Sequence, residues 1–301
     1  MKILPIVEGY LLDEEHRMRQ SHYASDANAC RRQLWYSWKN AEQSNPPTAG
    51  ALLKMKMGSA IEFIVEQALK WGMEKGMISD YVEQAYVDVN LGLKYPLHMR
   101  CDFLVVPAGS ADGQEIIEVK SSFGRGIVEI QRTGTPKEDN LVQCFLYLLH
   151  KAPRVTLVYF GRDNGYRTEF QLGLEEAGID ADQNTWKTLT VNGKVWDPEK
   201  YRMSAIREKF AGIERMIEMD ETPERDYIVA IKNGAIAEQA NGSNEYTYQK
   251  VRYKGDWQCN YCRWRDRCWA EALPIYAEGN NSAMFEARKN AGKGEDEDAD
   301  A

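Results

Sequence analysis

Two carboxylates and a lysine near the middle of the chain have the residue types and spacing of a metal-dependent hydrolytic site. Asp102 stands in the run MRCDFLVV, and Glu118, Val119 and Lys120 stand in the run QEIIEVK. On a strand, side chains at positions i and i+2 share a face, so Glu118 and Lys120 point the same way. If Asp102 lies on the neighbouring strand, the two carboxylates and the Val119 carbonyl offer hard oxygen ligands to magnesium or manganese. Lys120 would then orient or help deprotonate a metal-bound water, or offset the charge of a phosphate under attack.

The simpler interpretation of Glu118 and Lys120 is a solvated pair on an edge strand. A further carboxylate favours the site: Glu62 follows Gly58 by four residues in a stretch with helical periodicity. It would reach the sheet if that face of the helix packs inward, and would otherwise belong to a solvent-facing row with neighbouring charged residues.

Gln143 and Tyr147 are four residues apart and share one face of an expected helix, so both side chains can reach one pocket. The candidate catalytic residues are Glu62, Asp102, Glu118, Lys120, Gln143 and Tyr147. The candidate metal ligands are Glu62, Asp102, Glu118 and Val119, the last through its carbonyl.

Four of the six cysteines form a second constellation. Cys259, Cys262 and Cys268 follow a C-x2-C-x5-C pattern, and Cys30 lies more than 200 residues upstream. Four thiolates suit a tetrahedral metal or an iron-sulfur cluster, so the fold is expected to bring these distant segments together. Zinc is the alternative to iron. The remaining cysteines, Cys101 and Cys144, stand in apolar runs where a thiol behaves as a small hydrophobe.

Charge is unevenly distributed along the 301 residues, whose formal net charge is −8. Residues 291–301 contain five acids and one lysine and have almost nothing to bury, which predicts a disordered acidic tail. Residues 250–269 carry a net charge of +4 interleaved with tryptophan and tyrosine around the cysteines. Such a mixture suits phosphates and stacked bases, or simply the packing and solvation of a metal lobe.

Hydrophobic periodicity predicts the elements that must position these residues. Helices are expected over about 56–71, 138–151 and 199–219. Strands are expected at 81–91, 99–106, 114–120, 154–160 and 167–172, with the second and third forming a hairpin. This order predicts a mixed α/β fold with a crossover rather than an all-parallel doubly wound sheet.

With these residues in place, the chain resembles the RecB-type branch of the PD-(D/E)XK nuclease superfamily. The likeness is to members with an iron-sulfur cluster, such as the AddB nuclease domain and the CRISPR-associated RecB-like exonucleases (Cas family four). The motifs that carry it are, in family order, Gly58 with Glu62, Asp102, Glu118 with Lys120, Gln143 with Tyr147, and the four cysteines. The chain departs from the family in having Cys101 where the naming proline stands and Glu62 where many members have histidine.

The resemblance implies a restriction-endonuclease-like core with a mixed central sheet flanked by helices. It also implies a lobe at the two ends of the chain, held by a 4Fe-4S cluster on Cys30, Cys259, Cys262 and Cys268. We therefore expect a single nuclease domain over 1–290, with its core at about 56–172 and its lobe at about 25–55 and 198–276.

The function implied is a magnesium- or manganese-dependent deoxyribonuclease, an exonuclease acting on single-stranded DNA or DNA ends. Expected partners are DNA and a helicase, single-strand-binding or recombination protein, because the chain contains no G-x4-G-K-[ST] phosphate loop of its own. The alternatives are a non-catalytic DNA-binding module on the same fold and a zinc-stabilised interaction domain. The absence of a basic leader and of a long apolar run predicts a cytoplasmic protein that does not associate with membranes.

Overall fold

The computed structural model describes residues 3–13, 18–110, 113–179, 185–196, 202–227, 229–231, 245–248, 251–255 and 257–271. The chain divides into two compact units, which are described separately. Unit 1 comprises residues 1–29 and 49–221, and unit 2 comprises residues 30–48 and 222–301. The acidic stretch 291–301 lies outside the described residues.

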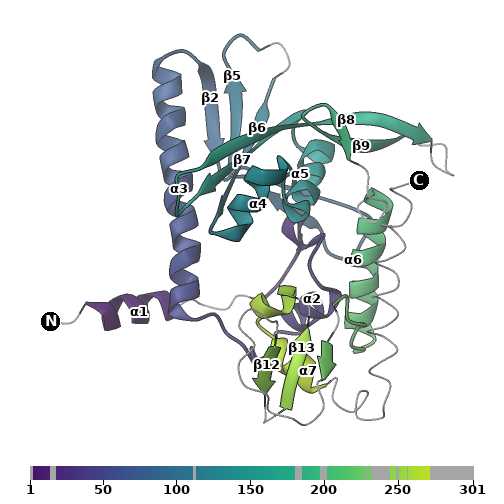
Figure 1. The fold of residues 1–301 in the computed structure, drawn as a ribbon. Coiled ribbons are helices and arrows are strands. Elements are labelled where there is room, and N and C mark those ends of the chain that lie inside the picture. Colours follow the sequence, from purple (N-terminus) through teal and green to yellow (C-terminus); the bar gives the residue numbers. More distant parts are fainter. Residues whose placement is uncertain are drawn as a thin grey trace, which may run out of the picture. The chain divides into compact units, whose positions relative to one another are not determined.

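Unit 1 contains a seven-stranded sheet in the order β10-β9-β8-β7-β6-β5-β2 (Figure 1). Its strands are β2 (Ile78–Glu83), β5 (Phe103–Pro107), β6 (Glu115–Ser122), β7 (Arg154–Gly161), β8 (Arg167–Ile179), β9 (Thr185–Val191) and β10 (Lys194–Trp196). Strands β6 and β7 run parallel, and the other neighbouring pairs described are antiparallel. The prediction of a mixed α/β fold is therefore confirmed, as is the hairpin of β5 and β6.

Helices α3 (Ala49–Glu74), α4 (Arg125–Thr133) and α5 (Glu138–His150) flank this sheet (Figure 1). Helix α1 (Leu4–Leu12) contacts α3, and unit 1 also contains α6 (Met203–Glu218). Leu69 of α3 packs into a buried cluster with Phe103, Val105 and Val119 of the sheet. Burial of each such side chain contributes about 1.5–3 kcal/mol. Because side chains alternate along β6, Val119 faces α3 while its neighbours Glu118 and Lys120 face the other side.

Helix α5 covers that other side and forms the crossover between the parallel strands β6 and β7. Its apolar residues include Leu141, Val142 and Phe145, which are buried. Glu138 and Asp139 stand in its first turn, where carboxylates interact favourably with the helix dipole. The observed bounds confirm the helix expected over 138–151. Helix α4, which lies beside α5 in Figure 1, was not predicted.

The run MRCDFLVV does not form one strand as expected. It divides into β4 (Leu97–Arg100) and β5, which belong to different sheets. At the break, the Cys101 N–H donates to the Ala85 carbonyl at 2.9 Å, and the Asp102 carbonyl accepts from Gln84 N at 2.8 Å. The run 81–91 divides at the same level into β2 and β3 (Tyr86–Val89). Both chain segments therefore pass between the two sheets at this level, and they lie next to each other as they do so.

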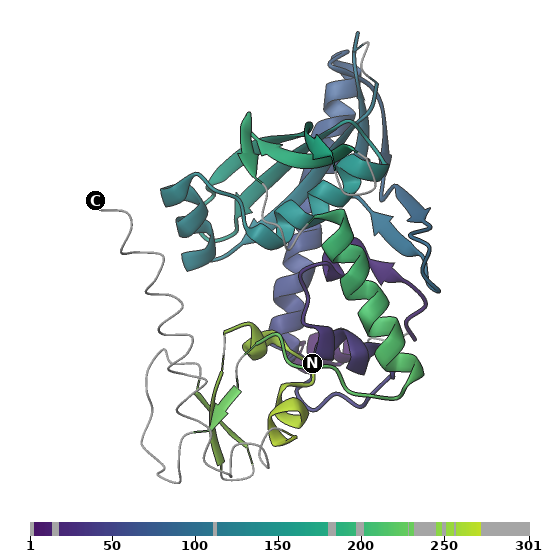
Figure 2. The same ribbon diagram turned by 90° about the vertical axis from the view of Figure 1, so that its right-hand side faces the viewer.

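The second sheet of unit 1 has the order β1-β4-β3, where β1 is His22–Tyr23 and is followed by the short helix η1 (Ala24–Asp26). Strand β4 pairs parallel with β1 and antiparallel with β3. Leu97 and Met99 of β4 are at most 1% exposed, so one face of the central strand of this small sheet is buried. Figure 2 shows the small sheet beside α6.

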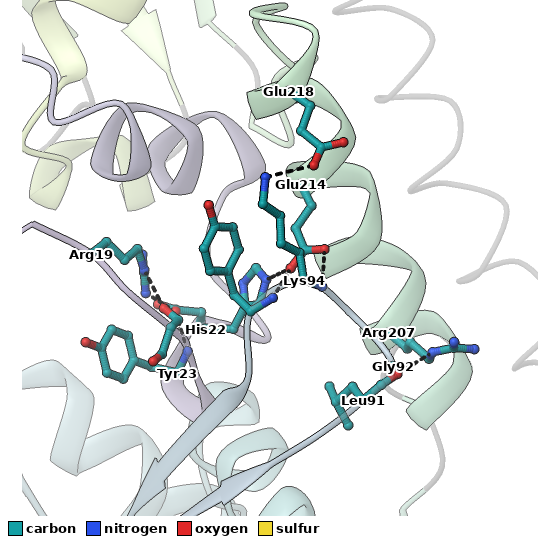
Figure 3. Close-up of polar contacts among 12 residues, drawn as sticks. Arg19, His22, Tyr23, Leu91, Gly92, Lys94, Arg207, Glu214 and Glu218 are labelled. Atoms are coloured by element: carbon teal, nitrogen blue, oxygen red, sulfur yellow. Dashed lines mark hydrogen bonds and ion pairs between the residues drawn. The ribbon is translucent and has the colours of Figure 1, made fainter.

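A buried carboxylate attaches α6 to the small sheet (Figure 3). Glu214 accepts hydrogen bonds from the backbone N–H groups of Lys94 and Tyr95, each at 3.0 Å. Its Oε1 also lies 3.0 Å from His22 Nε2, and the His22 ring stacks on Phe210 at 4.4 Å between centroids. The contacts assign α6 to unit 1, whereas the lobe expected at 198–276 included it.

We predict that His22 makes unit 1 less stable in mild acid. Burial lowers the pKa of His22 below its ordinary value, although Glu214 acts in the opposite direction. The unfolded chain therefore binds the proton more readily, and the free energy of unfolding should fall as the pH drops below about 6.5. Urea unfolding from about pH 7.5 to 5.5 should show a smaller loss for His22→Gln, which keeps an N–H donor for Glu214 but does not titrate. Equal pH dependence in both proteins would contradict this assignment.

Unit 2 joins the segment 30–48 to the end of the chain. It contains α2 (Arg31–Trp38), the antiparallel sheet β11-β13-β12, a short helix η3 (Trp257–Tyr261) and α7 (Arg265–Ala270). The strands of that sheet are β11 (Val229–Ile231), β12 (Glu245–Tyr248) and β13 (Val251–Gly255). Trp264 is 3% exposed, stacks on Tyr36 and donates its indole N–H to the Ala41 carbonyl at 2.9 Å. These contacts hold the two distant segments together.

Within the described part of the chain, the helices all fall short of the length and hydropathy that a membrane span requires.

Candidate active site

Asp102 occupies the junction between β4 and β5. Its Oδ2 accepts a hydrogen bond at 2.7 Å from the N–H of Val119 on β6. This side-chain hydrogen bond extends the pairing of β5 with β6 by one position. It holds the carboxylate beside the segment 118–120. The sequence expectation that Asp102 lies on a strand was wrong, because the residue stands at the bend just before β5.

Glu118 and Lys120 share one face of β6, as predicted. Glu118 is 1% exposed, and its Oε1 lies 2.6 Å from Lys120 Nζ. Its second oxygen lies 3.4 Å from the N–H of Asp102. The solvated edge-strand pair considered from the sequence is not what the structure contains, since β6 lies between β5 and β7 and the glutamate is buried.

Burial sets the electrostatics of this cluster. It raises the pKa of Glu118 above its usual range, with Lys120 opposing and Asp102 reinforcing the shift. It likewise raises the pKa of Asp102 against the effect of Lys120. Burial alone would lower the pKa of Lys120, but the two carboxylates outweigh it and raise that pKa. Lys120 is therefore an ammonium at neutral pH.

Gln143 and Tyr147 reach the same place from α5. Gln143 Nε2 donates to the Tyr147 hydroxyl at 2.6 Å, and this hydroxyl donates to the Arg100 carbonyl at 2.7 Å. Tyr147 is 1% exposed, and burial raises its pKa. These two hydrogen bonds thus fix Arg100 at the end of β4, two residues before Asp102.

These side chains open into a cavity of about 520 Å³. Its lining residues are Tyr23, Ala24, Ser25, His98, Arg100, Asp102, Glu118, Lys120, Gln143 and Tyr147. Five of the six predicted catalytic residues are among them. The residues that β1, η1 and β4 contribute to the cavity were not predicted from the sequence. The alternation of polar and apolar residues in LHMR is the signal that points to His98 and Arg100.

Glu62 lies on α3 and is not among the residues that line the cavity. It is half-buried, and its pKa is raised by burial and then by the Asp102 carboxylate, with Lys120 and Arg100 opposing. The charge of Glu62 therefore interacts with the charges of Asp102 and Lys120. Gly58 allows α3 to approach β6, because a Cβ at this position would lie 3.4 Å from Ser121 Oγ. In the charged row of α3, Glu66 pairs with Lys70 at 2.6 Å.

The donor chemistry of Asp102 and Glu118 fits a divalent cation, which would relieve the cost of burying Glu118 next to a second carboxylate. Asp102, Glu118 and the Val119 carbonyl are the residues that would hold it. Among the residues that the structure describes, no group of three or more histidine, cysteine, aspartate and glutamate side chains is already arranged as a metal site.

The four predicted cysteine ligands line one cavity of unit 2, together with Tyr36 and Arg225 among others. Burial raises the pKa of the Cys262 thiol to about 12 and also raises that of Cys268, which Arg225 opposes. Arg225 Nε lies 3.2 Å from Cys268 Sγ. The set offers four soft donors of the type that zinc or an iron-sulfur cluster uses.

Comparison with models of protein families finds no match. Comparison with curated proteins finds no significant match. Among solved structures, one described as "Crystal structure of SSO0001" matches with a TM-score of 0.45 at 14% sequence identity, covering 87% of this chain and 94% of that one. Similarity at this level does not establish that the two folds are equivalent.

Proposed function

We propose that the protein is a magnesium- or manganese-dependent DNA nuclease, an exonuclease acting on single strands or ends, with a restriction-endonuclease-like core in unit 1. One observation carries the proposal. The buried carboxylate of Glu118 and the half-buried carboxylate of Asp102 lie beside an ammonium group, Lys120, at a cavity of about 520 Å³. Paired carboxylates with a lysine suit hydrolysis of an anionic phosphodiester better than they suit a structural role.

A cation held by Asp102, Glu118 and the Val119 carbonyl would supply Lewis acidity toward the phosphate and lower the pKa of an attacking water. In the hydrolysis, a water oxygen forms a bond to phosphorus while the bond to one ester oxygen breaks, and that oxygen leaves with a proton. Lys120 is the residue placed to stabilise the negative charge that develops. Its raised pKa favours this role over that of a base.

Tyr147 and Gln143 act as positioning residues in this proposal. Their hydrogen bonds hold the Arg100 carbonyl, and Asp102 follows two residues later. The Arg100 side chain is exposed at the same cavity, where its guanidinium can bind a phosphate of the DNA backbone. Glu62 does not line the cavity. It would act on the metal site through its negative charge or by holding a metal-bound water.

We further propose that Cys30, Cys259, Cys262 and Cys268 bind a structural 4Fe-4S cluster in unit 2, with zinc as the alternative. Support comes from the cavity of unit 2 that all four thiols line, and from the softness of sulfur donors, which suits both iron-sulfur clusters and zinc. A visible absorption spectrum of anaerobically purified protein separates the two, because zinc has a filled d shell and is colourless.

The proposal is tested by incubating the protein with single- and double-stranded DNA labelled at either end, with manganese or with a chelator. We expect manganese-dependent shortening of the DNA. Binding without cleavage would favour the alternative of a non-catalytic DNA-binding module, and the absence of both would favour an interaction domain.

Manganese should also stabilise unit 1 through Asp102. At a concentration 100 times its dissociation constant, a ligand that binds only the folded state adds about 2.7 kcal/mol to the free energy of unfolding. We expect the thermal midpoint to rise with manganese in the wild type but not in Asp102→Asn, whose amide oxygen can still accept from Val119. The control is Asp80→Asn, on an exposed residue of β2, which should keep the wild-type response. The same manganese response in Asp102→Asn as in the wild type would remove Asp102 from the ligand set.

A further inference from the structure

One face of the small sheet β1-β4-β3 is exposed although it carries aromatic residues. The register pairs Tyr23 with His98 and Tyr86 with Arg100. Because directly paired residues point to the same side of a sheet, these four side chains share one face. Tyr86 is 67% exposed and Tyr23 is 39% exposed.

The rings on this face lie against one another. His98 stacks on Tyr86 with 5.7 Å between ring centroids and 25° between ring planes. Tyr23 meets His98 edge to face at 5.8 Å, and the guanidinium of Arg19 lies 4.9 Å from the centroid of the Tyr23 ring. His98 is also held by a hydrogen bond between its Nδ1 and Asp88 Oδ1 at 2.6 Å. The imidazole is thus fixed in orientation while Tyr86 remains largely exposed.

Packing of the unit does not account for these rings. The hydrophobic core lies on the opposite face of the same strands, where Leu97 and Met99 are at most 1% exposed. Exposed aromatic groups that cover no core are typical of surfaces that stack on a ligand.

The aromatic face continues directly into the cavity. Tyr23, His98 and Arg100 line it together with Asp102 and Glu118. A polymer that places one phosphate at the carboxylates can therefore place its neighbouring units on the rings.

We propose that Tyr86, His98 and Tyr23 form a stacking surface for unpaired bases next to the scissile phosphate, and that this surface selects single-stranded DNA. The inference rests on the proposed nuclease function and adds the residues that choose its substrate. Every base offers a π face, so such stacking tolerates any sequence. In a duplex, neighbouring base pairs cover those faces everywhere except at the outer side of the terminal pair, so the rings can stack on far fewer bases. Arg100, on the same face, binds the phosphate between a stacked base and the carboxylates.

The test measures fluorescence anisotropy of labelled oligonucleotides, with all proteins in a Glu118→Gln background so that the DNA stays intact. Stacking of one base contributes about 1–3 kcal/mol, so Tyr86→Ala should weaken single-strand binding roughly tenfold. Tyr86→Phe should restore it. Tyr10→Ala is the matched control, because Tyr10 is 72% exposed on α1 and lies outside the stacking surface.

An oligonucleotide with abasic sites separates stacking from charge. If the rings stack on bases, Tyr86→Ala should bind abasic DNA and blunt duplex with the same affinity as the protein without this substitution. Wild-type affinity of Tyr86→Ala for single strands, or an equal loss on abasic DNA, would overturn the inference.

The two proposals fail in different ways. Manganese-dependent cleavage by the wild type, with no effect of Tyr86→Ala on binding, would refute the stacking surface and leave the nuclease intact. A base-dependent loss of binding in Tyr86→Ala, without any cleavage by the wild type, would refute the nuclease and support the surface.

Discussion

Replacement of Glu118 by glutamine should lower the rate of manganese-dependent DNA cleavage by at least about 100-fold. The change removes the buried one of the two carboxylates at the cavity and preserves the volume of the side chain. It also replaces the charged partner 2.6 Å from Lys120 Nζ with a neutral amide, which weakens the ion pair that orients the ammonium. Since both groups act on the reacting phosphate in the proposed mechanism, the loss should appear in kcat, as measured by the initial rate of label release.

Substrate affinity provides the internal control for this variant. The neutral amide repels DNA less than the carboxylate does, so binding of single strands should be retained or improved. Glu129→Gln is the matched substitution on α4, where the glutamate is exposed and pairs with Arg132. It should cleave at the wild-type rate. Loss of binding together with cleavage in Glu118→Gln would indicate a structural role for Glu118 instead.

Replacement of Cys262 by serine should abolish the metal binding that we propose for unit 2 and destabilise that unit by several kcal/mol. Metal binding by structural thiolate sites contributes about 10–16 kcal/mol in small zinc domains, and a hydroxyl is a poor substitute for a thiolate. The cavity that the cysteines line is formed by residues of α2, η3 and α7, so a metal bound there would join these short elements. Metal content, visible absorption and protection of unit 2 from proteolysis are the measurements.

Cys101→Ser serves as the control for this change. Cys101 is buried in unit 1, where its Sγ donates to the Ala85 carbonyl at 3.3 Å, and serine retains a donor. This variant should keep the metal of unit 2 and its protection. A Cys262→Ser protein with wild-type metal content and protection would show that the cysteine cavity does not bind a structural metal through this thiol.

The sequence was most informative where an arrangement depends on local periodicity. Glu118 and Lys120 share a face because strands have a period of two, and Gln143 and Tyr147 share a face because they are one helical turn apart. Neither relation needs knowledge of the tertiary fold. The structure places all four at one cavity.

Prediction was least successful where strands exchange partners between sheets. The apolar run around Asp102 reads as one strand, yet it divides because β4 pairs with β1 and β3 while β5 pairs with β2 and β6. The partners β2 and β3 likewise come from one continuous run in the sequence, and β1 lies far upstream, so no local pattern reveals the break. The aromatic face was missed for the same reason, since Tyr23, Tyr86 and His98 come together only through that pairing.

The boundary of the lobe also depended on contacts that spacing cannot show. Helix α6 precedes the C-terminal cysteines in the chain, which suggested that it belongs with them. Its buried residues Phe210 and Glu214 instead contact the small sheet of unit 1. The cysteine spacing correctly grouped four residues that line one cavity, while their binding of an iron-sulfur cluster stays a prediction.

The central claim is that Asp102, Glu118 and Lys120 form a metal-dependent site for phosphodiester hydrolysis. The most direct measurement is the release of nucleotides from end-labelled single-stranded DNA in manganese, by wild-type protein and Glu118→Gln purified in parallel. We expect the wild type to release nucleotides and a chelator to stop this release. The variant should release nucleotides at least about 100-fold more slowly. Equal release by the two proteins, or none by the wild type, would contradict it.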